Sequence, residues 1–174
     1  MTLRQILTEP NKILRQKSLP VDNVNKDTQI LMDDMLETMY AAPGIGLAAI
    51  QVGIPKRIIV LDIEQKEGQK NPLFFINPEI IEKSKNLLTY EEGCLSVPGQ
   101  FAEIERPDRC HIKYLDYNGE KKEINAKGML ATCIQHEMDH LEGILFIDYL
   151  SKLKKSMIIK KLSKQKKVLE RIVV

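Results

Sequence analysis

The chain has 174 residues, of which 43% are hydrophobic and 29% are charged, and its net charge is +2. This balance excludes a disordered or fibrous protein, and the sequence contains no apolar run long enough to cross a bilayer. We therefore expect one domain covering residues 1–174 and no membrane partner.

The cysteines and the N-terminal residues indicate a cellular compartment. Cys94, Cys110 and Cys133 are an odd number of thiols in a chain of this length, which favours a reducing environment over a disulfide framework. Residues 1–16 lack the continuous apolar core of a signal peptide, and they do not resemble a transit peptide. The expected location is therefore the cytoplasm.

A helix followed by strands is predicted for the first two thirds of the chain. Hydrophobic residues recur at helical spacing from Asp27 to Ala41, and Pro43-Gly44 ends the pattern. Runs rich in β-branched and aromatic residues at 57–63, 72–76 and 110–117 predict strands. Asn118-Gly119 then suits a type I′ turn that returns the chain as a strand through 121–126.

Two more helices are predicted towards the C-terminus. From Lys127 to Glu142 apolar residues and histidines share one helical stripe, and Gly143 suits a helix end. A lysine-rich helix follows from Ser151 into the 160s, with a discontinuous apolar face made of Leu153, Met157, Leu162 and Leu169. Helices at both ends of a strand-rich centre predict an α+β fold.

The helix at 127–142 carries the sequence HEMDH at 136–140. Residues four apart on a helix point the same way, so His136 and His140 can donate two imidazole nitrogens to one metal ion. Glu137 would then lie beside them, close enough to face a bound water. The alternative is that both histidines are packed core residues, because this pattern is only moderately specific when it stands alone.

A third ligand would decide between these alternatives, and it is expected upstream. Cys133 lies one turn before His136, which would place three donors along a single helix, so it is interpreted as a packed neighbour. Cys110 is interpreted as a core cysteine. The favoured ligand is Cys94 in EEGCLSVPG, because Gly93 lets the backbone approach closely and residues 95–97 can run as a strand.

A second glycine-rich stretch, GIGLAAIQ at 44–51, follows the first helix. Its small residues would tolerate a closely packed ligand, and Gln51 supplies a side-chain amide. Alone, it would be interpreted as a tight turn into a buried strand.

In this order, the three stretches GIGLAAIQ, EEGCLSVPG and QHEMDH resemble the signature motifs of peptide deformylases, and EGCLS and HExDH stand unaltered. The resemblance covers essentially the whole chain. It implies one catalytic domain in which antiparallel β-sheets pack around the HExxH helix, with an N-terminal helix and a basic C-terminal helix. It also implies removal of the formyl group from the formyl-methionine of newly made polypeptides, with release of formate.

The resemblance implies a divalent ion held by Cys94, His136 and His140, with Fe(II) expected in the cell and Zn(II), Ni(II) or Co(II) in purified protein. It implies Glu137 as the acid and base, and it places the Leu95 N–H and the Gln51 amide at the oxyanion. The residues implied around a pocket for the methionine side chain are Ile45, Gly46 and Gly93, with Tyr90, Met129 and Cys133 as further walls.

Four other positions bear on the resemblance. Glu92 and Arg106 are interpreted either as a charge pair that braces the cysteine loop or as solvated surface charges. Position 50 is Ile where many relatives have Thr or Pro, and position 101 is Phe where many have Arg. Phe101 leaves open how the peptide is held beyond its first residue.

The C-terminal residues 151–174 hold nine basic and one acidic residue, a net charge of +8, whereas residues 1–150 hold 17 basic and 23 acidic residues. This helix is interpreted as a solvated element docked by its apolar face or, as the resemblance implies, as a contact with the ribosome. Two other functions remain open, a peptidase that uses the same metal and an inactive relative that only binds.

Overall fold

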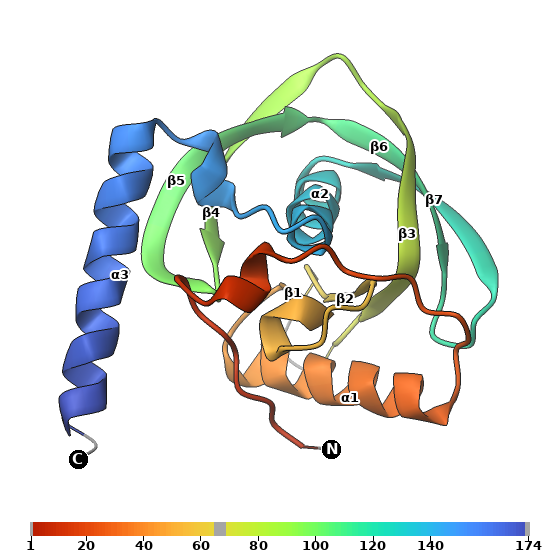
Figure 1. Cartoon of the computed structure of the whole chain (residues 1–174). Coiled ribbons are helices and arrows are strands. Elements are labelled where there is room, and N and C mark those ends of the chain that lie inside the picture. The colour runs from red at the N-terminus through yellow and green to blue at the C-terminus, as the bar shows by residue number, and fades with distance from the viewer. Residues whose placement is uncertain (1, 65–68, 173–174) are drawn as a thin grey trace.

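The computed structural model describes residues 2–64 and 69–172, with side chains up to residue 168 after the gap (Figure 1). It confirms the α+β fold. Three short 3-10 helices, η1 (Lys12–Arg15), η2 (Ala49–Val52) and η3 (Phe146–Tyr149), accompany the main elements. These are α1 (Lys26–Ala41), β1 (Gly46–Ala48), β2 (Ile58–Leu61), β3 (Leu73–Lys83), β4 (Leu87–Cys94), β5 (Val97–Pro107), β6 (Arg109–Leu115), β7 (Lys121–Lys127), α2 (Met129–Leu141) and α3 (Lys152–Ile172).

The strands form two antiparallel units. The order in the larger sheet is β1-β2-β3-β6-β7, and β4 pairs with β5 in a separate ribbon. Figure 1 shows α2 in the centre with the strands around it, as the resemblance implies. Within the described residues, none of the helices combines the length and the apolar character that a membrane span requires.

The strand β2 is buried on both faces, which explains its continuous apolar sequence. Ile58 and Val60 join the hydrophobic cluster formed with α1, whereas Ile59 and Leu61 join the cluster formed with α2. The predicted first helix is confirmed, and Asn25 caps it by accepting a hydrogen bond from the Thr28 N–H. The larger sheet is thus held between α1 and the helix that carries HEMDH.

Apart from Val97, the ribbon of β4 and β5 has no counterpart among the predicted strands. Alternate positions on it are exposed and mostly polar, and two of the positions that face inward are Glu92 and Arg106, so the period-2 apolar signal is weak. The strand predicted over 95–97 is wrong for Leu95 and Ser96, which form the turn between β4 and β5. This turn places Cys94 at the end of a strand.

The β6–β7 hairpin is confirmed, but its turn differs from the predicted type. A type I′ turn needs positive φ at both central residues. Gly119 has a φ of 81°, whereas among the described residues only Pro43 and Asn77 have positive φ without being glycine, so Asn118 does not. The Asp116 carboxylate accepts hydrogen bonds from the backbone N–H groups of Asn118 and Glu120, both at 2.9 Å, and so favours a longer loop.

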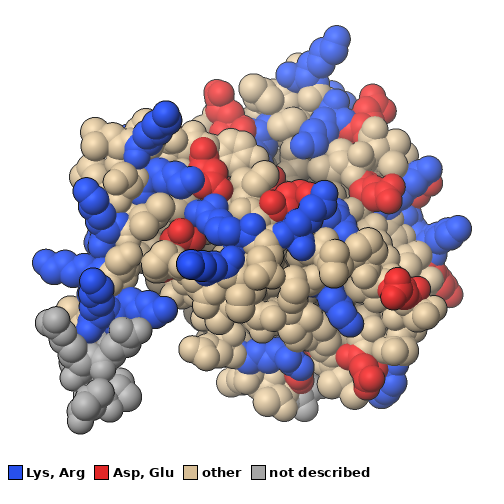
Figure 2. Space-filling model, in the orientation of Figure 1, with Lys and Arg blue, Asp and Glu red and all other residues tan. Residues whose placement is uncertain are grey.

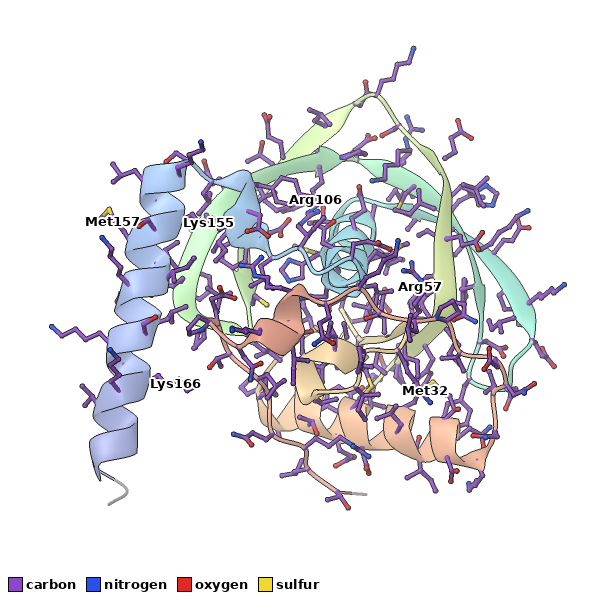
Figure 3. All side chains as sticks on the ribbon, in the orientation of Figure 1. Met32, Arg57, Arg106, Lys155, Met157 and Lys166 are labelled. Atoms are coloured by element: carbon purple, nitrogen blue, oxygen red, sulfur yellow. The ribbon has the colours of Figure 1, made fainter. Side chains whose placement is uncertain are left out.

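The predicted basic helix is confirmed as α3, but its packed face differs from the predicted one. Ile158, Ile159 and Leu162 pack on a cluster that includes Val97 and Phe146. Leu153 and Met157 were assigned to the packed face wrongly, since they are 72% and 62% exposed. Met157 points away from the rest of the molecule (Figure 3). Leu169 lies outside the described side chains.

An ion pair accompanies this orientation of α3. Lys155 contacts Asp148 in η3, and the Asp148 carboxylate also pairs with Arg15 at 2.6 Å. Holding Lys155 on the inner side places Ile158, Ile159 and Leu162, which follow at helical spacing, against the ribbon. Because α3 carries lysines on every side, its sequence does not show which side packs. The packed side depends on contacts with residues that are distant in the chain.

Candidate metal centre

The helix α2 brings His136, Glu137 and His140 to one side, and β4 brings Cys94 to meet them. His136 is 9% exposed and His140 is fully buried. The donor atoms of Cys94, His136 and His140 all lie within 4.8 Å of one another, and Cys94 Sγ is 3.3 Å from His140 Nε2. Sequence-distant residues thus form a compact group of one sulfur and two nitrogen donors.

A buried ion pair orients one of the imidazoles. Glu92 Oε2 lies 2.8 Å from His136 Nδ1, so the other ring nitrogen, Nε2, is directed towards Cys94. Arg106 donates to both oxygens of Glu92, at 2.6 and 3.0 Å. Glu92 and Arg106 are therefore a buried charge pair, and the alternative of solvated surface charges is wrong.

Arg106 also contacts a second carboxylate, that of Asp139. Arg106 Nη1 donates to Asp139 Oδ2 at 2.8 Å, and the Tyr149 hydroxyl donates to that oxygen at 2.8 Å. Figure 3 shows Arg106 beside α2. Asp139 and Tyr149 were not singled out from the sequence. Asp139 is the fourth residue of HEMDH, so the motif itself could have indicated it. Nothing in the sequence indicates Tyr149, because its contact with Asp139 depends on the placement of η3.

The charges around the three donors fit a cation. Burial by itself would lower the pKa of His136, but hydrogen bonds to Cys94 and Glu92 outweigh it and hold the pKa well above the usual range. Burial and the neighbouring His136 lower the pKa of His140 well below its usual range. The site thus favours positive charge near Cys94 while His140 stays neutral, and a donor set of thiolate with imidazole suits zinc or iron.

Glu137 lies next to the donors with little access to water. It is 5% exposed, and its Oε2 has no hydrogen-bond partner within the described residues. Burial raises the pKa of this carboxyl to about 7. Gly46 makes the approach possible, since a Cβ there would lie 2.4 Å from Glu137 Oε1.

Hydrogen bonds hold the side chain of Gln51 beside Cys94. Its Oε1 accepts from the Ala48 N–H at 2.8 Å, and its Nε2 donates to Ser96 Oγ at 3.1 Å and lies 3.6 Å from Cys94 Sγ. The stretch GIGLAAIQ therefore forms β1 and the 3-10 helix η2, rather than only a turn into a strand. Ser96, fully buried, was not singled out, although it belongs to the EGCLS motif.

A pocket of about 480 Å³ opens beside these residues. The two predicted oxyanion residues Gln51 and Leu95 line it, as do Cys94, His136 and Glu137. The six residues predicted around a methionine pocket all line it as well: Ile45, Gly46, Tyr90, Gly93, Met129 and Cys133. Cys133 also belongs to the core cluster, and burial raises its pKa to about 12, so it is a packed thiol.

The fold and this donor set define a metal-dependent hydrolase. Residues 3–156 match the family model of polypeptide deformylase. The peptide deformylase of Pelagibacter ubique is 69% identical over 166 residues, which are 95% of this chain and 96% of that protein. The chain therefore belongs to the polypeptide deformylase family, whose activity is removal of the formyl group from nascent polypeptides.

Solved structures of the family agree with this assignment. The peptide deformylase of Ehrlichia chaffeensis in complex with actinonin superposes with a TM-score of 0.89 at 47% identity, covering 95% of this chain and 98% of that chain. The Acinetobacter baumannii enzyme bound to Met-Ala-Ser superposes with a TM-score of 0.80 at 35% identity, covering 84% of this chain and 98% of that chain.

Proposed function

We propose that this chain carries out the family reaction on N-formyl-methionyl polypeptides at an ion held by Cys94, His136 and His140. The observation that carries the proposal is the proximity of the three donors, within 4.8 Å, beside the buried carboxyl of Glu137. Fe(II) is the expected ion in the cell, with Zn(II), Ni(II) or Co(II) as substitutes in purified protein. A divalent ion supplies a Lewis acid that makes water more acidic at neutral pH.

Glu137 is proposed to move the proton. It would take a proton from the attacking water and return it to the amine released from the formyl group, so one carboxyl serves as base and then as acid. Burial raises the pKa of this carboxyl above the usual range of a glutamate, which makes it a stronger base. Because Glu137 is 5% exposed, little bulk water can take up the proton while this carboxyl holds it.

The oxyanion that forms on the formyl oxygen is proposed to be held by the Leu95 N–H and the Gln51 side-chain amide. Gln51 is well suited because the Ala48 N–H fixes its oxygen and leaves its NH₂ directed at Ser96 and Cys94. A donor already oriented needs no reorganisation as charge develops. The turn at Leu95 and Ser96 brings a second donor from the neighbouring motif.

The methionine side chain is proposed to enter the 480 Å³ pocket between Ile45, Tyr90 and Met129. Gly46 and Gly93 border it with backbone alone, and Cys133 closes one wall. The Acinetobacter baumannii structure holds Met-Ala-Ser, the product that formyl-Met-Ala-Ser would leave. Formyl-Met-Ala-Ser is therefore a suitable test substrate for this chain.

Formate release from formyl-Met-Ala-Ser by anaerobically purified protein tests the proposal. The wild type and Glu137→Ala are compared, with the metal content of both determined. We expect the variant to keep its metal and to lose activity by about a thousandfold, since proton transfer contributes roughly 10²–10⁴. Cleavage of an unformylated peptide would instead indicate a peptidase, and metal-loaded wild type that only binds peptides would indicate an inactive relative.

We further propose that α3 meets the ribosome and that the protein, one domain over residues 1–174, works in a bacterial cytoplasm. Lys and Arg side chains gather over α3 (Figure 2), where they would favour a polyanion such as ribosomal RNA. Deleting residues 163–174 should weaken binding to ribosomes and reduce its salt dependence. Binding unchanged after the deletion would contradict a ribosomal role for this helix.

A further inference from the structure

The apolar lining of the pocket extends to its solvent-exposed edge. Three large hydrophobic residues that line the pocket are exposed to solvent, and they come from three parts of the chain: Ile45 before β1, Phe101 in β5 and Met129 at the start of α2. Phe101 is 66% exposed, compared with 44% for Ile45 and 42% for Met129. An exposed phenyl ring at the edge of a substrate pocket offers apolar surface that a bound peptide can cover.

The ring of Phe101 is held in place by the ribbon. Phe101 pairs with Gly93 across the β4–β5 ladder. A Cβ on residue 93 would lie 2.6 Å from Phe101 Cε1 and 2.8 Å from Cδ1, so the ring lies directly on the glycine backbone. Gly93 immediately precedes Cys94. The ring therefore lies against the backbone one residue away from a proposed metal ligand.

From this placement we infer that Phe101 is a specificity-determining residue. It contacts the side chain of one of the two residues that follow the methionine of the substrate, and it selects apolar side chains there. The inference rests on the proposed function, because the position of Phe101 relative to the substrate follows from methionine occupying the pocket. Ile45 and Met129 border the other sides of the same opening.

Two carboxylates lie near Phe101 on the ribbon. Glu103 and Glu91 are cross-strand partners, and Glu103 lies two residues after Phe101 on the exposed side of the ribbon. Charged substrate residues would respond to these carboxylates as well as to the ring. Peptides that differ only in uncharged residues isolate the contribution of Phe101.

The first experiment compares kcat/KM for formyl-Met-Ser-Ser, formyl-Met-Leu-Ser and formyl-Met-Ser-Leu. The wild type should prefer one of the leucine peptides by about fivefold, since a partly buried leucine gains roughly that much. Phe101→Ala should reduce the preference to less than about twofold, and Phe101→Leu should restore part of it. Leu87→Ala is the matched control, because Leu87 is an exposed apolar residue at the far end of the same ribbon.

The second experiment measures binding of the unformylated peptides Met-Ser-Ser, Met-Leu-Ser and Met-Ser-Leu to the metal-loaded protein by calorimetry. The same Phe101-dependent preference is expected in the dissociation constants. An equal leucine preference in wild type and Phe101→Ala, or no preference in wild type, would overturn the inference while formate release still upheld the proposed function. Absence of formate release with a Phe101-dependent preference in binding would overturn the proposed function alone.

Discussion

The helices α2 and α3 differ in how the rest of the molecule holds them. Nine of the 13 residues of α2 are buried, and its His136 and Asp139 are bound by side chains from β4, β5 and η3. Of the 21 residues of α3, Leu162 is the only buried one among those with described side chains. This fold therefore fixes its chemical groups from several directions and leaves its basic helix attached along one side.

Removing the thiol of Cys94 should have the largest effect. Cys94→Ala leaves two imidazoles, and three protein ligands are the usual minimum for a catalytic ion of this kind. We expect the metal content of the purified variant to fall below about a tenth of an equivalent and formate release to become undetectable. Cys110→Ala is the control, because Cys110 is a buried core thiol that does not line the pocket beside Cys94. Retention of metal by Cys94→Ala would contradict the proposed ligand set.

Removing the charge of Arg106 should break the network around α2. Glu92 would then be buried without its arginine partner, and breaking a buried ion pair in this way typically costs about 3–5 kcal/mol in the free energy of unfolding. Urea denaturation of Arg106→Met, with and without metal, measures this loss. Arg109→Met removes an arginine whose side chain is 62% exposed, and it should change stability by less than about 0.5 kcal/mol. Similar losses in both variants would show that the Glu92–Arg106 pair does not hold the site.

Replacing Gln51 tests whether a group outside α2 contributes to the chemistry. Gln51→Leu keeps the approximate volume and removes the amide, and loss of one oxyanion donor typically lowers kcat by roughly 10²–10³. We expect that decrease with metal content and KM nearly unchanged. A variant that raised KM and left kcat intact would indicate that Gln51 binds substrate and does not stabilise the transition state.

The sequence predicted the elements whose determinants are local. The spacing of His136 and His140 places both on one helical face, and the α1 pattern ends where Pro43-Gly44 ends it. Three other features depend on contacts between distant residues: the inward Arg106 on β5, the Tyr149 hydroxyl on Asp139 and the docked side of α3. Such contacts override weak local patterns, so the β4–β5 ribbon and the packed face of α3 could not be obtained from periodicity.

Truncating Leu162 should loosen α3 and leave the site intact. Leu162 is 4% exposed in the cluster with Val97 and Phe146, and a buried leucine truncated to alanine loses about 2–3 kcal/mol. Because α3 is held on one side, we expect faster amide hydrogen exchange along residues 152–168 and little change in formate release. Equal acceleration in α2 would show that the two helices unfold together and would remove the contrast between them.

Truncating Leu153 or Met157, two exposed apolar residues of α3, should have the smallest effect. Leu153 and Met157 face solvent at 72% and 62% exposure, so alanine at either position removes no packing and should change stability by less than about 0.5 kcal/mol. Thermal unfolding of Leu153→Ala and Met157→Ala beside Leu162→Ala measures the difference within one helix. A loss at Met157 as large as that at Leu162 would mean that α3 docks through the face predicted from the sequence. Stability unaffected at Met157, together with weaker ribosome binding, would instead assign this outer face to the proposed partner.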